Sequence, residues 1–144
     1  MTSLQKNIIN SQVTLGKAKR LINYLKMENS TWINLGVKQN EVEKAERLLK
    51  DIQKELGEIA VTVIETIPSN NFNEETESFF KDSFRIAFFD LNKIYSDVKN
   101  IKKNIKTRTD QRNNVEKIDE HFKQFINDYQ KIKNQLEQVL LNNN

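Results

Sequence analysis

The stretch FKDSFRIAFFDLNKIYSDVKNI, residues 80–101, carries an apolar residue at alternating steps of four and three. These positions are Phe80, Phe84, Ala87, Leu91, Ile94, Val98 and Ile101. A seven-residue repeat places all of them along one side of an α-helix, as in helices that pack like coiled coils. A β-strand would instead alternate with period two, so the stretch predicts a long amphipathic helix.

Three further segments show the same repeat. They occupy residues 4–25, 42–66 and 115–139, and the first stretch extends to Ile105. In all four segments, only Ser11 and Thr66 are small polar residues at a heptad position. A repeat that keeps its phase through four segments predicts four helices, and their expected bounds are 3–27, 38–67, 74–106 and 110–141.

Turn-forming residues are scarce in this chain. Three glycines and one proline in 144 residues are too few for a many-stranded β fold, which needs a turn about every ten residues. Charged residues make up 30% of the chain, which suits long helices with solvated outer faces. The length is typical of one domain. We therefore expect residues 1–144 to form one all-α domain, an antiparallel up-down-up-down four-helix bundle with coiled-coil-like heptad packing.

Short connections between long helices favour antiparallel neighbours. A repeat of 3.5 residues per turn favours left-handed packing at crossing angles near 20°. Two alternatives stay open at this point. Residues 28–37 form either a true loop or an early start of the second helix at Ser30 or Thr31. The whole chain forms either one bundle or two long hairpins that pair with another chain.

Several classes of chemistry lack the residues that they need. The absence of cysteine excludes disulfides, thiolate metal sites and cysteine nucleophiles. The one histidine, His121, lies at the edge of an apolar stripe, where we expect a boundary residue rather than a catalyst. Three carboxylates have lysines beside them, which indicates a solvated helical face: Glu116, Asp119 and Glu120. We therefore predict no enzyme activity, no cofactor and no metal site.

Location is suggested by what the sequence lacks. No stretch approaches 18 consecutive apolar residues, so we expect no transmembrane segment. Residues 1–10 lack the apolar run of a signal peptide, which favours a cytoplasmic protein. The abundance of asparagine, lysine and isoleucine suggests an AT-rich genome, such as that of a low-GC bacterium or its phage.

The third predicted helix has more phenylalanine than its core face needs. On a helical wheel, Phe80, Phe84 and Phe88 belong to the core face. A second stripe on the opposite side consists of Phe79, Ile86 and Phe89. In the first helix, Ile9 and Val13 also lie off the core line, in the same half of the bundle. Clustered apolar side chains on a surface mark an interaction site, and aromatic anchors are favoured there.

These residues support a first functional hypothesis. The protein is a non-catalytic interaction module that binds a protein partner, or further copies of itself, through an outer helical face. It would act as an inhibitor, an immunity protein or an adaptor, encoded by a phage or mobile element. The competing explanation is that the second stripe is covered, either by residues 68–73 with Phe72 or by the tail around Leu140 and Leu141.

Basic residues support a second hypothesis, in which the bundle binds nucleic acid or another anionic surface. Residues 1–27 and 98–109 each carry five basic residues and no acidic one, and the topology brings them to one end. The candidate anion-binding residues are Lys17, Arg20, Lys99, Lys102, Lys103, Lys106, Arg108 and Arg112. Complementarity to the helix dipoles is a competing explanation, and the net charge is only +3.

Overall fold

The computed structural model describes residues 3–30, 39–66, 74–103 and 108–142, and each of these ranges is one α-helix. The helices are α1 (Ser3–Ser30), α2 (Gln39–Thr66), α3 (Glu74–Lys103) and α4 (Arg108–Asn142). The described ranges contain no strand, so the predicted all-α fold is confirmed. Within them, no helix combines the length and the apolar character that a membrane crossing requires.

The observed helix bounds differ slightly from the predicted ones. Helix α1 continues to Ser30, past its predicted end at 27, and α4 begins at Arg108, ahead of its predicted start at 110. The predicted end of the third helix at 106 lies outside the described residues. The same holds for the connection at 31–38, for 67–73 with Phe72, and for the last two residues, 143–144.

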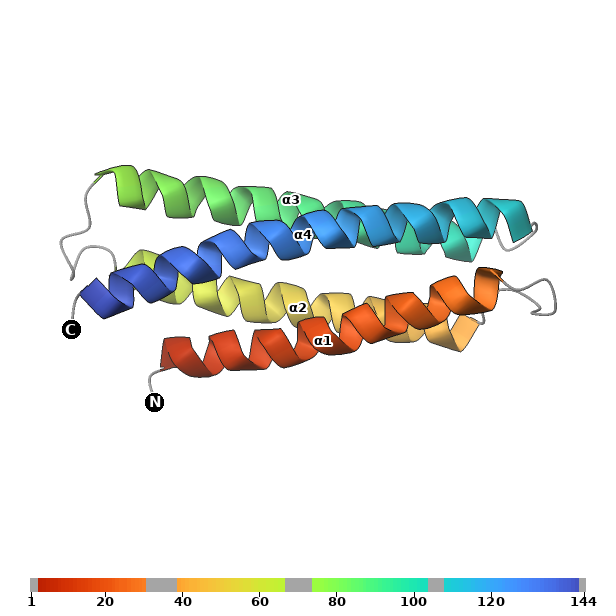
Figure 1. Cartoon of the computed structure of the whole chain (residues 1–144), viewed down its shortest axis with the longest axis horizontal. Helices are drawn as coiled ribbons and strands as arrows, with labels where there is room; N and C mark the ends of the chain where they lie inside the picture. The colour runs from red at the N-terminus through yellow and green to blue at the C-terminus, as the bar shows by residue number, and fades with distance from the viewer. Residues whose placement is uncertain (1–2, 31–38, 67–73, 104–107, 143–144) are drawn as a thin grey trace.

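The four helices form an elongated bundle in which successive helices run in opposite directions (Figure 1). Helix α1 packs against α2 and α4, and α3 also packs against α2 and α4. The helices therefore form a ring in which α1 and α3 are diagonal to each other. Side-chain pairs give the register of α3 and α4: Asp90 meets Asp128, and Asp97 meets His121. In these pairs, the residue number rises along α3 while it falls along α4, as antiparallel packing requires.

The core follows the heptad repeat that the sequence predicts. Every heptad position whose side chain the structure describes is buried or half-buried. The largest fully buried side chains include Phe80 of α3 and Phe125 of α4, each with 0% exposure. The ring of Phe125 lies 6.4 Å from that of Phe122 and 6.2 Å from that of Tyr129, between ring centroids. Aromatic rings of α4 thus fill much of the central layer.

Ser11 is a polar residue at a buried heptad position, and its hydroxyl is satisfied there. It donates to the backbone oxygen of Ile8 at 2.8 Å and forms a hydrogen bond with the hydroxyl of Tyr129. Burial raises the pKa of Tyr129, and the hydrogen bond between Tyr129 and Ser11 acts in the opposite direction. A buried hydroxyl with a partner costs little, so Ser11 does not interrupt the core.

Burial predicts which isoleucines support the bundle. Ile94 is fully buried, whereas Ile9 has 45% exposure. We expect Ile94→Ala to lower the free energy of unfolding by about 2–5 kcal/mol, because it removes contacts and leaves a cavity. Ile9→Ala, the matched control, should change it by about 0.5 kcal/mol or less. Urea denaturation measures both values, and equal losses would contradict the assigned core.

Candidate functional site

The outer face of α3 exposes three large apolar side chains, which we call the α3 outer patch: Phe79, Ile86 and Phe89. Their exposed fractions are 37%, 40% and 60%. The ring of Phe79 meets that of Phe80 edge to face, with 5.8 Å between centroids, so a core residue supports the patch from beneath. The ammonium of Lys93 lies 4.6 Å from the centre of the Phe89 ring. The patch therefore combines rigid apolar anchors with a cation at its border.

The other predicted apolar residues are exposed as well, but on a different side. Ile9 and Val13 of α1 have 45% and 52% exposure. Because α1 and α3 are diagonal in the ring, the structure does not join these two residues to the α3 outer patch. Helix α2, a neighbour of α3, exposes Val61 and Ile64, which the sequence analysis did not single out. Exposed apolar residues thus surround the half of the bundle where α1 begins.

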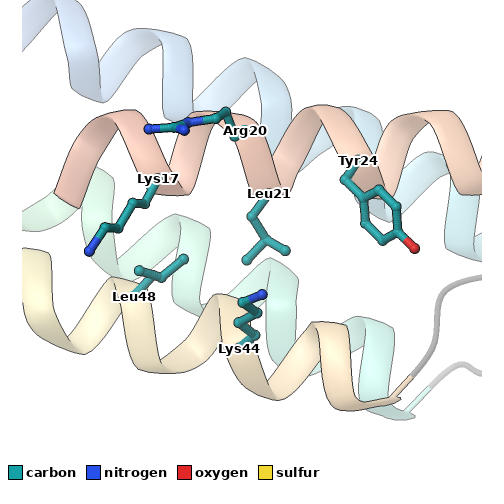
Figure 2. Close-up of a pocket in the computed structure, with 6 residues that line it drawn as sticks. All are labelled: Lys17, Arg20, Leu21, Tyr24, Lys44 and Leu48. Carbon is teal, nitrogen blue, oxygen red and sulfur yellow. The ribbon is translucent and has the colours of Figure 1, made fainter. Parts of the chain in front are cut away.

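A groove between α1 and α2 is lined by cations and apolar side chains (Figure 2). Its volume is about 470 Å³, and its lining residues are Lys17, Arg20, Leu21, Tyr24, Lys44 and Leu48. In Figure 2, the side chains of Lys17 and Lys44 reach into the space between the two helices, and Arg20 lies along α1. None of the lining side chains that the structure describes is acidic. The arrangement suits an anion that carries an apolar part.

The structure brings together part of the predicted basic set. Lys17 and Arg20 share the groove with Lys44, which the sequence analysis did not include. Lys99 is exposed, and its ammonium lies 5.0 Å from the centre of the Tyr95 ring. The structure does not describe the side chains of Lys102, Lys103, Arg108 and Arg112, and Lys106 lies outside the described residues altogether.

Polar side chains occupy the buried contact between α3 and α4. We call Asp90, Asp97, His121 and Asp128 the α3–α4 polar seam. Asp90 and Asp97 are buried, with 2% and 7% exposure. The Nδ1 atom of His121 lies 2.5 Å from Oδ2 of Asp97, and the side chain of Asp90 is hydrogen-bonded to that of Asp128. Two residues on each helix, seven positions apart, thus pair across the interface.

The carboxyls of Asp90 and Asp128 share a largely buried environment. Burial raises the pKa of Asp90 to about 7, and both the hydrogen bond with Asp128 and the negative charge of Asp128 add to the effect. The positive charges of Lys93 and His121 act in the opposite direction. One oxygen of each carboxyl, Oδ2, is buried without a hydrogen-bond partner. Two desolvated carboxyls in contact cannot both ionise readily, so the pair retains a proton near neutral pH.

Further polar contacts join α1 to α4 and α1 to α2. Asp119, which the sequence analysis placed on a solvated face, pairs with Lys123 at 3.1 Å and with Lys26 of α1 at 3.0 Å. Burial alone would raise the pKa of Asp119, but hydrogen bonds from the two lysines lower it. Between α1 and α2, the Thr14 hydroxyl donates to Glu55 at 3.1 Å, while burial raises the pKa of this carboxyl.

The seam is a packing contact that lies apart from the groove. Within the described ranges, no group of three or more histidine and acidic side chains could hold a metal ion. The groove of Figure 2 lies between α1 and α2, on the far side of the ring from the α3–α4 contact. Its occupant would therefore not reach the carboxyls of the seam. We assign the seam to the packing of α3 on α4.

The sequence analysis missed the seam, although the sequence contains a signal for it. Asp90 and Asp97 are seven residues apart, and so are His121 and Asp128. In each helix this second repeat runs directly beside the apolar heptad, at positions that face a neighbouring helix.

No protein-family model, curated protein or solved structure matches the chain. Its function is therefore inferred from its own residues.

The raised pKa of Asp90 predicts a pH dependence of stability. In the unfolded chain an aspartate titrates near pH 4, whereas Asp90 in the folded chain holds its proton up to about pH 7. Between these values the folded state binds more protons, so its stability should fall as the pH rises and then level off above pH 7. The expected result is a lower urea midpoint at pH 8 than at pH 5.

The variant Asp90→Asn isolates this effect. Its amide can donate to Asp128 at any pH, so we expect unfolding at pH 8 to require about 1–3 kcal/mol more than in the natural chain. The difference between pH 5 and pH 8 should shrink accordingly. Glu116→Gln, at an exposed carboxyl of α4, serves as the control and should leave the pH profile unchanged. An unchanged profile in Asp90→Asn would rule out the shared proton.

Proposed function

We propose that the protein is a non-catalytic protein-interaction module that binds its partner through the outer face of α3. The observation that carries this proposal is the α3 outer patch, where Phe79, Ile86 and Phe89 are all exposed on the outer side of one helix. Such a module would serve as an inhibitor, an immunity protein or an adaptor.

The patch has the composition of an interface centre. Phenylalanine is enriched at the cores of interfaces, and clustered aromatic side chains often dominate the binding energy. Burying these side chains against a partner would remove apolar surface from water, which contributes about 25 cal/mol per Å². Single exposed apolar residues are common on proteins, but a group of three on one helical face is the kind of surface that marks an interaction site.

The patch is also held in a fixed conformation. The opposite face of α3 is anchored by Phe80, Ala87 and Ile94, each with 0% exposure. The backbone that carries the patch therefore needs little ordering when a partner binds, which reduces the entropic cost of association. Phe79 has a further constraint, because its ring rests on that of Phe80.

The proposal predicts that polar substitutions on α3 abolish binding without unfolding the chain. We expect the double variant Phe79→Ser, Phe89→Ser to retain its helical circular dichroism and to lose association, measured by light scattering and by quantitative capture of host proteins. The matched control is Ile9→Ser, Val13→Ser, which removes two exposed apolar residues from the diagonal helix. Equal association in both variants would argue against the α3 face as the binding surface. Unfolding of the Phe79→Ser, Phe89→Ser variant would show that these two rings belong to the core.

A second candidate function is the binding of nucleic acid or another anionic surface. The observation that favours it is the α1–α2 groove, where Lys17, Arg20 and Lys44 are among the described lining residues and none of those is acidic. Three cations on one surface attract phosphate groups, and such binding weakens steeply with salt. An apolar interface tolerates salt, so the two candidate functions differ in a simple measurement.

The groove predicts a charge-specific loss of binding. We expect the triple variant Lys17→Ala, Arg20→Ala, Lys44→Ala to bind a fluorescent DNA duplex at least about tenfold more weakly than the natural chain. The control, Arg47→Ala, Lys50→Ala, Lys54→Ala, removes the same charge from exposed positions of α2 outside the groove lining. Fluorescence anisotropy at several salt concentrations measures both. Equal weakening in the two variants would show a diffuse charge effect rather than a site.

A further inference from the structure

The α3 outer patch is the centre of a longer repeat on the same helix. We call this the outer stripe, and its residues are Glu75, Phe79, Asp82, Ile86, Phe89, Lys93, Ser96 and Asn100. They follow one another at alternating steps of four and three, the same period as the core stripe of α3. All are exposed except Lys93, which is half-buried. Helix α3 therefore carries two heptad stripes, one facing the bundle and one facing away from it.

We propose that the partner of this face is a second copy of the chain, docked so that the two α3 helices pack antiparallel to each other. The two-fold axis passes between Ile86 and Phe89. This inference rests on the proposed function, because it uses the same face and names what binds there.

Charge and apolar character at the centre of the outer stripe, from Asp82 to Lys93, are self-complementary, whereas Phe79 lies beyond this centre and faces Ser96 of the second copy. A two-fold axis midway between positions 86 and 89 relates the two copies of α3. Each residue on one side of the axis then faces the residue of the second copy that lies equally far from the axis in the sequence. Ile86 then faces Phe89 of the second copy, and Asp82 faces Lys93 of the second copy. Symmetry repeats each contact, which gives two apolar pairs at the centre and an ion pair on either side. Self-complementary surfaces of this kind form closed dimers.

The other arrangements of the same two stripes are less favourable. In a parallel pair, Asp82 would face its own copy and Lys93 would do the same, so like charges would oppose each other. An antiparallel pair shifted by one heptad would bring Phe79 opposite Phe89 and Glu75 opposite Lys93, but Asp82 opposite Ile86. That shift would bury the Asp82 carboxylate against an apolar side chain, without a partner across the interface, which is costly. The charges therefore oppose the parallel orientation, and the burial of Asp82 opposes the shifted register.

Both charged side chains are available for the proposed contact. Within the chain, Asp82 has a 3.9 Å contact with Arg85, and both side chains are at least 70% exposed. Such an exposed, long ion pair contributes little and is readily exchanged. Lys93 already lies over the Phe89 ring. In the dimer its ammonium would sit between this ring and Asp82 of the second copy, where an ion pair and a cation–π contact act together.

The arrangement of the helices leaves room for the contact. Helix α3 packs against α2 and α4 and is diagonal to α1, so its outer stripe points away from the centre of the ring. Two bundles can therefore meet along their α3 edges. Val61 and Ile64 are exposed on the adjacent helix α2 and would widen the apolar border of the interface.

A charge-reversal series tests the pairing. Sedimentation velocity over a range of concentrations should show the natural chain passing from 17.0 kDa to twice that mass. Asp82→Lys alone, or Lys93→Glu alone, places like charges opposite each other and should raise the dissociation constant at least about tenfold. The double variant Asp82→Lys, Lys93→Glu restores opposite charges and should recover dimerisation. Single variants that dimerise normally, or a double variant weaker than both, would overturn the pairing.

Cysteine cross-linking tests the register, and the natural chain contributes no cysteine of its own. Mixing the variants Asp82→Cys and Lys93→Cys under mild oxidation should give a disulfide-linked heterodimer. Mixing Glu75→Cys with Lys93→Cys should not, because these positions meet only in the register shifted by one heptad. Cross-linking of the second pair in preference to the first would overturn the proposed axis.

The same measurements separate this inference from the proposed function. One possible result is that the chain stays at 17.0 kDa at every concentration while a complex with another protein depends on Phe89. This result would contradict the proposed dimer and would support the outer face of α3 as a binding surface for another protein. If Phe89→Ser changes neither the mass nor any complex, both proposals fail. A dimer that Phe89→Ser dissociates, and that shows the charge-reversal rescue, supports both.

Discussion

Burial of one apolar stripe on each of four helices is the constraint on which the rest of this bundle depends. Because the stripe repeats every seven residues, it keeps the same side of each helix turned inward along its whole length. Once that side is fixed, so is the direction of every other position. The same rotation of α3 that buries Ile94 carries Asp90 into the contact with α4 and turns Phe89 toward solvent. The polar seam and the outer patch are therefore two consequences of one packing requirement.

The polar seam adds specificity to a repeat that alone would leave the alignment of α3 on α4 weakly defined. Apolar heptads can slip by seven residues and still bury their stripes. In the observed register, Asp90 pairs with Asp128 and Asp97 with His121. A slip of one heptad in either direction would keep only two of these four side chains paired with each other. Buried polar groups contribute little net stability, but loss of a partner is costly, so the seam opposes slippage more than it strengthens the fold.

The sequence was sufficient for the parts of the structure that depend on local repetition. Four segments with a heptad repeat determine four helices and their inner faces. A single polar residue in the repeat, such as Ser11, does not disturb the pattern. The sequence was insufficient wherever the answer depends on contacts between helices. Ser11 is tolerated because Tyr129, distant in the chain, meets its hydroxyl. Lys44 joins Lys17 only through the register of α1 and α2, and the separation of Ile9 from the α3 outer patch follows from the order of helices around the ring.

The charges of the outer stripe need an explanation that α3 alone does not provide. Acidic residues in the first turn, such as Glu74 and Glu75, complement the helix dipole. Asp82 lies in the third turn and Lys93 lies ten residues before the end of α3 at Lys103, and the dipole effect is confined to the terminal turns. Within α3, Asp82 has an i,i+3 contact with Arg85 at 3.9 Å, but so long and exposed an ion pair contributes little. An acid before the apolar pair and a base after it form an ordered sequence that another α3, running in the opposite direction, would match at these four positions.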